Sequence, residues 1–166
     1  STQGVSSAAS DVYKRQLVYR VARNMRIRVD GVLGAGVSAK DLVIYVVHRI
    51  GAQGARGHAV EFCGTAIDAL SAEARMTLCN MTVEAGARAA LIAPDGTTDA
   101  YVTTHAPQLR GETLAAARAY WSTLRTDDGA VFHVEHAFDA ADIAPFVTWG
   151  TTVSYTHLTL PTILLV

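Results

Sequence analysis

Apolar and polar residues alternate in two stretches of the chain, and a period of two predicts half-buried β-strands. In residues 25–29 arginines separate the apolar positions, and residues 131–138 alternate again. Residues 58–62 favour a third short strand or an extended loop. Longer stretches with helical spacing lie between these segments, so that the order of elements indicates an α/β fold.

Three stretches predict helices. Ser38 stands three residues before Asp41, which is the spacing of a capping box, and the helix that follows has a continuous apolar face. A second helix is expected to begin after Ser71 and to run to about residue 90. A third covers residues 112–124, and short helical turns are expected at 66–70 and 98–101. The residues expected to face inward in the third helix are Leu114, Ala117, Tyr120, Trp121 and Leu124.

The composition is that of one globular domain. The chain has 166 residues, of which 50% are hydrophobic and 17% charged, and this balance excludes a disordered chain. A formal net charge of −1 gives no overall field toward nucleic acid or an anionic membrane. The longest apolar block, residues 42–47, is far shorter than the roughly 18 residues of a membrane-spanning helix. We expect a cytoplasmic protein without nucleic-acid or membrane partners.

The two ends differ in composition from the middle. Residues 1–16 are rich in Ser and Ala without any period, and residues 152–166 contain no charged residue and finish on an apolar run. Natural termini are usually polar, and an exposed apolar tail favours aggregation. We therefore expect both ends to be non-native adapter-like segments around a natural piece, residues 17–151, of a longer protein.

Asn80 and Glu84 are the most informative polar residues of the second helix. In a helix they share a face, and their neighbours are mostly apolar or small. A carboxylate in such a setting is costly unless it is paired or used. Pairing with Arg88, four residues further on, is the structural alternative, and spacing alone favours it.

The glycine run from Gly34 to Gly36 fits G-x-G-x-x-A between a strand and a helix, which is a weak dinucleotide fingerprint. The alternative function of another class is therefore a non-catalytic nucleotide-binding α/β domain. Two features count against a nucleotide site. The preceding strand alternates with arginine, whereas a central parallel strand is expected to be continuously apolar. The segment from Asp30 to Leu33 also lengthens the connection, whereas the fingerprint requires a tight turn.

Other polar groups suggest no strong site. On an alternating strand His133 and Glu135 face one way and His136 the other, which makes a poor set of metal ligands. Cys63 and Cys79 form no C-x-x-C pair and are best interpreted as buried thiols. A basic stretch without acids contains Lys14, Arg15, Arg20, Arg23, Arg26 and Arg28. We interpret it as a solvated strand face rather than a nucleic-acid patch.

Five sequence blocks occur in one order, and together they resemble the large subunit of 3-isopropylmalate dehydratase, of the aconitase superfamily. The blocks span residues 36–42, 58–64, 75–87, 93–98 and 145–151. The resemblance implies a fragment of an aconitase-type three-layer α/β/α domain. It also implies a hydro-lyase of leucine biosynthesis that interconverts 2- and 3-isopropylmalate by dehydration and rehydration.

The resemblance further implies a [4Fe–4S] cluster in the full-length protein. Its three cysteine ligands come from motifs that this chain lacks, so no metal ligand is expected here and the chain alone is expected to be inactive. In the family pattern Asn80 falls beside the cluster and Glu84 hydrogen-bonds the iron-bound water or hydroxyl. A separate small subunit is the implied partner, and homoaconitase or another aconitase-like hydratase is the alternative within the superfamily.

Overall fold

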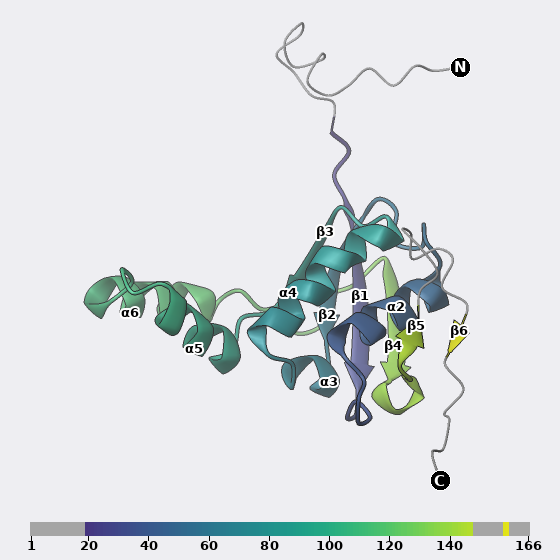
Figure 1. Cartoon of the computed structure of the whole chain (residues 1–166). Coiled ribbons are helices and arrows are strands. Elements are labelled where there is room, and N and C mark those ends of the chain that lie inside the picture. The colour runs from purple at the N-terminus through teal and green to yellow at the C-terminus, as the bar shows by residue number, and fades with distance from the viewer. Residues whose placement is uncertain (1–18, 148–157, 160–166) are drawn as a thin grey trace, which may run out of the picture.

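The computed structural model describes residues 19–147 and 158–159 (Figure 1). The elements in chain order are β1 (Arg23–Asp30), α2 (Ala39–Ile50), β2 (His58–Cys63), α3 (Thr65–Asp68), α4 (Ala72–Met81), the 3₁₀ turn η1 (Thr82–Ala85), β3 (Ala89–Ile92), α5 (Gly96–His105), α6 (Gly111–Trp121), β4 (Val134–Asp139), the 3₁₀ turn η2 (Ala140–Asp142), β5 (Phe146–Val147) and β6 (Leu158–Thr159). Among these, no helix combines the length and the apolar content needed to cross a bilayer.

A parallel sheet of four strands, in the order β3-β2-β1-β4, forms the centre of the fold. In β1, Met25 is in register with Val60 of β2 and with Val134 of β4. Helices connect successive strands, as parallel pairing requires. The predicted α/β class is confirmed. The short strands β5 and β6 pair antiparallel in a separate two-stranded sheet.

The sheet is buried on one face by α2, α3 and α4, which lie together on that side in Figure 1. Met25, Ile27 and Val29 of β1 are completely or almost completely buried against these helices. Arg26 and Arg28 point to the other face, where Arg26 pairs with Glu135 at 2.9 Å. The expectation that an alternating strand is not central in a parallel sheet is therefore wrong. The described helices cover only one face of β1, and alternation is what one-sided burial requires.

Helix α2 confirms the predicted capping box. Ser38 Oγ accepts a hydrogen bond from the Asp41 amide, and the Asp41 carboxylate accepts one from the Ser38 amide at 2.8 Å. The same carboxylate accepts from the amide of Phe146 at 2.7 Å. Tyr45 meets the rings of Phe138 and Phe146 edge-on. Because β5 covers its outer side, α2 is buried on more than the one predicted face.

The prediction that one face of residues 112–124 packs inward is wrong for helix α6. The helix forms, but none of its residues is buried, and Tyr120 and Leu124 are 64% and 43% exposed. Together with α5 it projects sideways from the sheet (Figure 1), and Arg118 holds Asp99 of α5 through two hydrogen bonds. Helical spacing identified the helix correctly, but an apolar face does not say that the same domain covers it.

The expected adapter-like segments fall mostly outside the described residues. Residues 1–16 lie outside them entirely, and of residues 152–166 only Leu158–Thr159 is described, paired with β5. The proposed boundaries at 17 and 151 therefore stay predictions.

Gly64, between β2 and α3, offers a test of how closely β1 and β2 pack. Its φ is +108°, and a Cβ there would lie 2.3 Å from the carbonyl oxygen of Val29. We expect Gly64→Ala to lower the free energy of unfolding by about 3 kcal/mol or more, as measured by urea denaturation.

Gly36 is the matched control, because its φ is +80° but a Cβ would meet nothing within 4 Å. Gly36→Ala is expected to cost only about 1 kcal/mol, from backbone strain alone. Equal losses for the two variants would contradict the close approach at Gly64.

Candidate functional site

Helix α4 is shorter than the sequence predicts. It starts as expected at Ser71, whose hydroxyl accepts from the Ala74 amide at 3.3 Å, and it buries Arg75 and Leu78. It ends at Met81, so the expectation of a helix to about residue 90 is wrong.

The helix ends for local reasons. The Thr82 hydroxyl donates to the Leu78 carbonyl at 2.6 Å, and the chain tightens into η1. The Ala85 carbonyl accepts from the Ala55 amide at 2.9 Å, and Gly86 adopts a left-handed conformation with φ +81°. A glycine in this conformation is a common end of a helix, and the chain continues into β3, which the sequence analysis missed. Gly86 was the signal that could have revealed it.

Asn80 and Glu84 lie on either side of this transition, in the last turn of α4 and in η1. Both side chains are exposed, and neither has a hydrogen-bond or ion-pair partner in the described part of the chain. The sequence predicts that Glu84 lies among apolar side chains, where a carboxylate is costly. This prediction is wrong, because the side chain is exposed. Arg88 does not pair with Glu84 in the structure either. Its guanidinium donates to the Arg20 carbonyl at 2.6 Å and lies over the Tyr19 ring.

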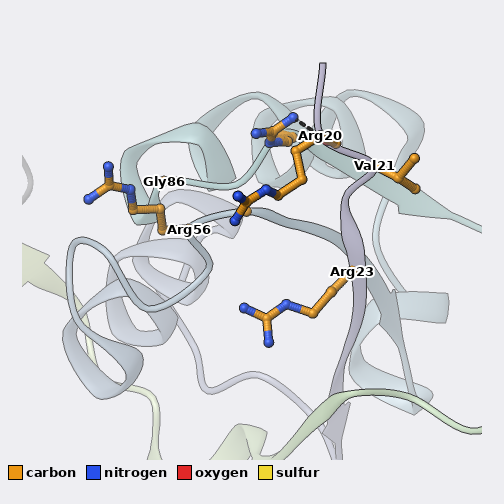
Figure 2. Close-up of a pocket in the computed structure, with 7 residues that line it drawn as sticks. Arg20, Val21, Arg23, Arg56 and Gly86 are labelled. Carbon is orange, nitrogen blue, oxygen red and sulfur yellow. Dashed lines mark hydrogen bonds between the residues drawn. The ribbon is translucent and has the colours of Figure 1, made fainter. Parts of the chain in front are cut away.

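These residues lie at the edge where the strands begin. Helix α4 returns from the carboxyl ends of the strands to their amino ends, so its last turn and η1 lie at the amino edge. A pocket of about 780 Å³ opens there, and Gly86, two residues after Glu84, lines it (Figure 2). The other lining residues are Arg20, Val21, Arg23, Arg56, Gly57 and Arg88. The candidate site thus combines free amide and carboxylate groups with a strongly basic pocket nearby.

Arg75 and Asp95 join two of the sequence blocks that carried the resemblance. The two carboxylate oxygens accept from the guanidinium at 2.7 and 2.6 Å, and Arg75 also donates to the Asp68 carbonyl at 2.8 Å. Asp95 in addition caps α5. The hydrogen bonds from Arg75 hold the pKa of Asp95 at about 2, so the carboxylate stays ionised down to strongly acidic pH.

A second pocket, of about 550 Å³, lies on the uncovered face near the carboxyl ends of the strands. Its lining mixes both charges and contains Arg26, Arg28, Glu61, Cys63, Asp68, Ala93, Pro94, Asp95, Arg125, Thr126, Asp127, Asp128 and Gly129. Partial burial raises the pKa of the Cys63 thiol, so it stays protonated near neutral pH. Neither Asn80 nor Glu84 belongs to this pocket.

The remaining sequence candidates form no site in the described residues. Glu135 pairs with Arg26, and His133 contacts Asn24. No group of three or more His, Cys, Asp or Glu residues is placed to hold a metal in residues 19–147 and 158–159.

The glycine turn does lie between β1 and α2, as a dinucleotide fingerprint requires. However, the Asp41 carboxylate occupies the amino end of α2. Burial alone would raise the pKa of Asp41, but hydrogen bonds from Ser38 and from the Phe146 amide outweigh it, and the pKa lies below its usual range. An ionised carboxylate already bound at this helix end disfavours a phosphate there.

The sheet with its covering helices defines an α/β domain of a kind found in many enzymes. The sequence matches the model of the aconitase family (aconitate hydratase) over residues 3–160. The chain belongs to the aconitase family, and this membership indicates a hydratase or lyase activity for the full-length enzyme.

Aconitase-family proteins generally bind a [4Fe–4S] cluster through cysteine thiolates, and the sequence contains two cysteines, Cys63 and Cys79. Cys63 is on the uncovered face of the sheet, whereas Cys79 is on α4, which covers the other face. Burial raises the pKa of both thiols, although cluster ligands are thiolates. The described residues therefore do not fit as a ligand set.

The ion pair between Arg75 and Asp95 gives a pH-dependent prediction. Removing the carboxylate leaves a buried guanidinium without its partner, so Asp95→Asn is expected to lower the free energy of unfolding by about 2 kcal/mol or more at pH 7. Because the folded-state pKa is depressed, this stabilisation is complete above about pH 4 and is lost as the pH falls toward 2. Urea denaturation at several pH values measures it.

Asp128→Asn is the control, since Asp128 is exposed and its side chain has no partner in the described part of the chain. It is expected to change stability by less than about 0.5 kcal/mol. A constant difference between wild type and Asp95→Asn from pH 7 down to pH 2 would contradict the assignment.

Proposed function

We propose that this chain is part of the large subunit of a 3-isopropylmalate dehydratase, a cytoplasmic hydro-lyase of leucine biosynthesis. The whole enzyme would interconvert 2-isopropylmalate and 3-isopropylmalate by removing and re-adding water. Support comes from five sequence blocks in one order together with the family match over residues 3–160. Homoaconitase or another aconitase-like hydratase is the alternative, because the residues that recognise the side chain of the substrate would lie largely outside this segment.

In this proposal Glu84 acts on the substrate hydroxyl. The observation that carries it is that Glu84 is exposed in η1 without a partner in the described residues, although its block fits the family pattern. A carboxylate that is not engaged within its own domain is available to hold or accept a proton at the substrate oxygen as water leaves. Asn80, one turn earlier and equally free, can donate a hydrogen bond from its amide to a substrate oxygen.

In this proposal, the cluster ligands and the second subunit are not part of this chain. Since Cys63 and Cys79 do not form a ligand set, cysteines elsewhere in the full-length protein would hold the cluster. A separate small subunit would complete the substrate site.

Replacement of Glu84 tests the proposed role in the complete enzyme. Glu84→Gln keeps the shape of the side chain and removes its charge and its proton. We expect kcat to fall by roughly 10²–10⁴, the usual contribution of a positioned acid or base, with the melting temperature unchanged because the side chain is exposed. Steady-state kinetics with 2-isopropylmalate measures it.

Glu112→Gln is the matched control, because Glu112 is also exposed and without a partner in the described residues but lies on α6. It is expected to leave kcat within about twofold. Turnover of Glu84→Gln near that of wild type, with cluster content verified, would end the assignment.

Cluster binding is tested on the chain itself. After anaerobic reconstitution with iron and sulfide we expect no stoichiometric cluster, since two thiols on opposite sides of the sheet cannot supply three ligands. Iron and sulfide analysis and visible absorption measure it. Four irons per chain, retained after gel filtration, would show that the ligands lie within this sequence.

A further inference from the structure

The pocket at the amino edge of the sheet concentrates positive charge without compensation. Four of its seven lining residues are arginines, and none is acidic. In the described part of the chain, the guanidinium groups of Arg20, Arg23 and Arg56 have no hydrogen-bond or ion-pair partner. Four arginines elsewhere in the fold pair with acids; these are Arg26, Arg28, Arg75 and Arg118. Of the four described arginines whose side chains have no such partner, three line this pocket, and the fourth, Arg125, lies after α6.

The backbone fixes where these arginines lie. The Arg23 amide donates to the Gly57 carbonyl at 3.0 Å, and the Arg88 amide donates to the His58 carbonyl at 2.9 Å. Arg23 is the first residue of β1, and Arg88 directly precedes β3. The two arginines therefore lie on either side of the start of β2. Adjacent strands are about 4.8 Å apart, so the two backbones are separated by roughly 10 Å. Long side chains from both sides can close on one small ligand.

The side chains of the pocket arginines also extend in defined directions. Figure 2 shows the side chains of Arg20 and Arg23 extending to the same side of the chain, toward the two segments that carry Arg56 and Gly86, whereas the guanidinium of Arg56 extends away from them. Arg88 is held by its bond to the Arg20 carbonyl and by the Tyr19 ring, 4.7 Å from its guanidinium carbon.

Two glycines, Gly57 and Gly86, line the pocket without side chains that would fill it. A Cβ at Gly86 would lie 3.4 Å from the Cα of Arg56, which is van der Waals contact, so the two segments pass close to each other. Apart from the arginines the lining consists of Gly57, Gly86 and Val21, which leaves little else to fill the space.

We propose that this pocket binds a small polyanion through two or more oxyanion groups, either phosphates or carboxylates. Guanidinium groups repel one another, and an anion between them removes that repulsion. Each planar guanidinium can also donate two parallel hydrogen bonds to one phosphate or carboxylate. The net charge of the chain is −1, so the attraction is local to this pocket. The proposal goes beyond the dehydration reaction and does not depend on it.

Calorimetric titration of the full 166-residue chain with pyrophosphate, and separately with succinate, tests the proposal. At 0.15 M salt we expect one saturable site for at least one probe. Arg20→Gln and Arg23→Gln are each expected to weaken it about tenfold or more, since each removes a charge-assisted hydrogen-bond donor. Both side chains are exposed, so the variants should fold as wild type does.

Arg110→Gln is the charge-matched control, because Arg110 is exposed before α6 and outside the pocket. It is expected to change affinity by less than twofold. Binding of pyrophosphate alone would identify a phosphorylated ligand, and binding of succinate alone a carboxylate ligand; either supports the site. No saturable binding of either probe, or equal weakening by Arg110→Gln, would overturn it. Either negative result leaves the hydro-lyase proposal standing, since the titration involves neither cluster nor substrate turnover.

Discussion

One-sided burial of β1 is the constraint on which the rest of the structure depends. Met25, Ile27 and Val29 pack under the helices, whereas Arg26 and Arg28 face the uncovered side of the sheet. Strand β1 lies between β2 and β4, and the buried face of β1 packs with the covering helices in one hydrophobic core. Because the strands are parallel, all of them begin at the same edge of the sheet, and both the end of α4 and the arginine pocket lie there.

The polar residues of the sequence blocks that resemble the aconitase family fall into two groups: some hold the fold together, and others have no partner in the described residues. Arg75 and Asp95 fasten α4 to the start of α5, and Asp41 fastens the start of α2 to β5 through the Phe146 amide. Their carboxylates are engaged in the fold, and each of these contacts joins two of the sequence blocks. Asn80 and Glu84 belong to the same blocks but have no partner in the described residues. Absence of a structural role is what makes them candidates for chemistry.

Local patterns were sufficient for much of the fold, because each records a local interaction. The arginine–apolar alternation identified β1, and the Ser38–Asp41 spacing identified the start of α2. Features that depend on distant contacts were not predictable. The bond from the Thr82 hydroxyl to the Leu78 carbonyl and the left-handed Gly86 end α4 early, so the helical pattern to residue 90 does not reveal β3. Likewise, the arginines near the N-terminus form a pocket only once Arg56 and Arg88 are brought beside them.

The central claim is that Glu84 is free in this domain because it serves the substrate. A crystal structure of the complete enzyme with 2-isopropylmalate bound tests it most directly. The account predicts a Glu84 carboxylate oxygen within hydrogen-bond reach of the substrate hydroxyl, about 2.6–3.2 Å, with the Asn80 amide against another substrate oxygen. A Glu84 side chain paired with a basic residue of another domain, and remote from the substrate, would contradict the account.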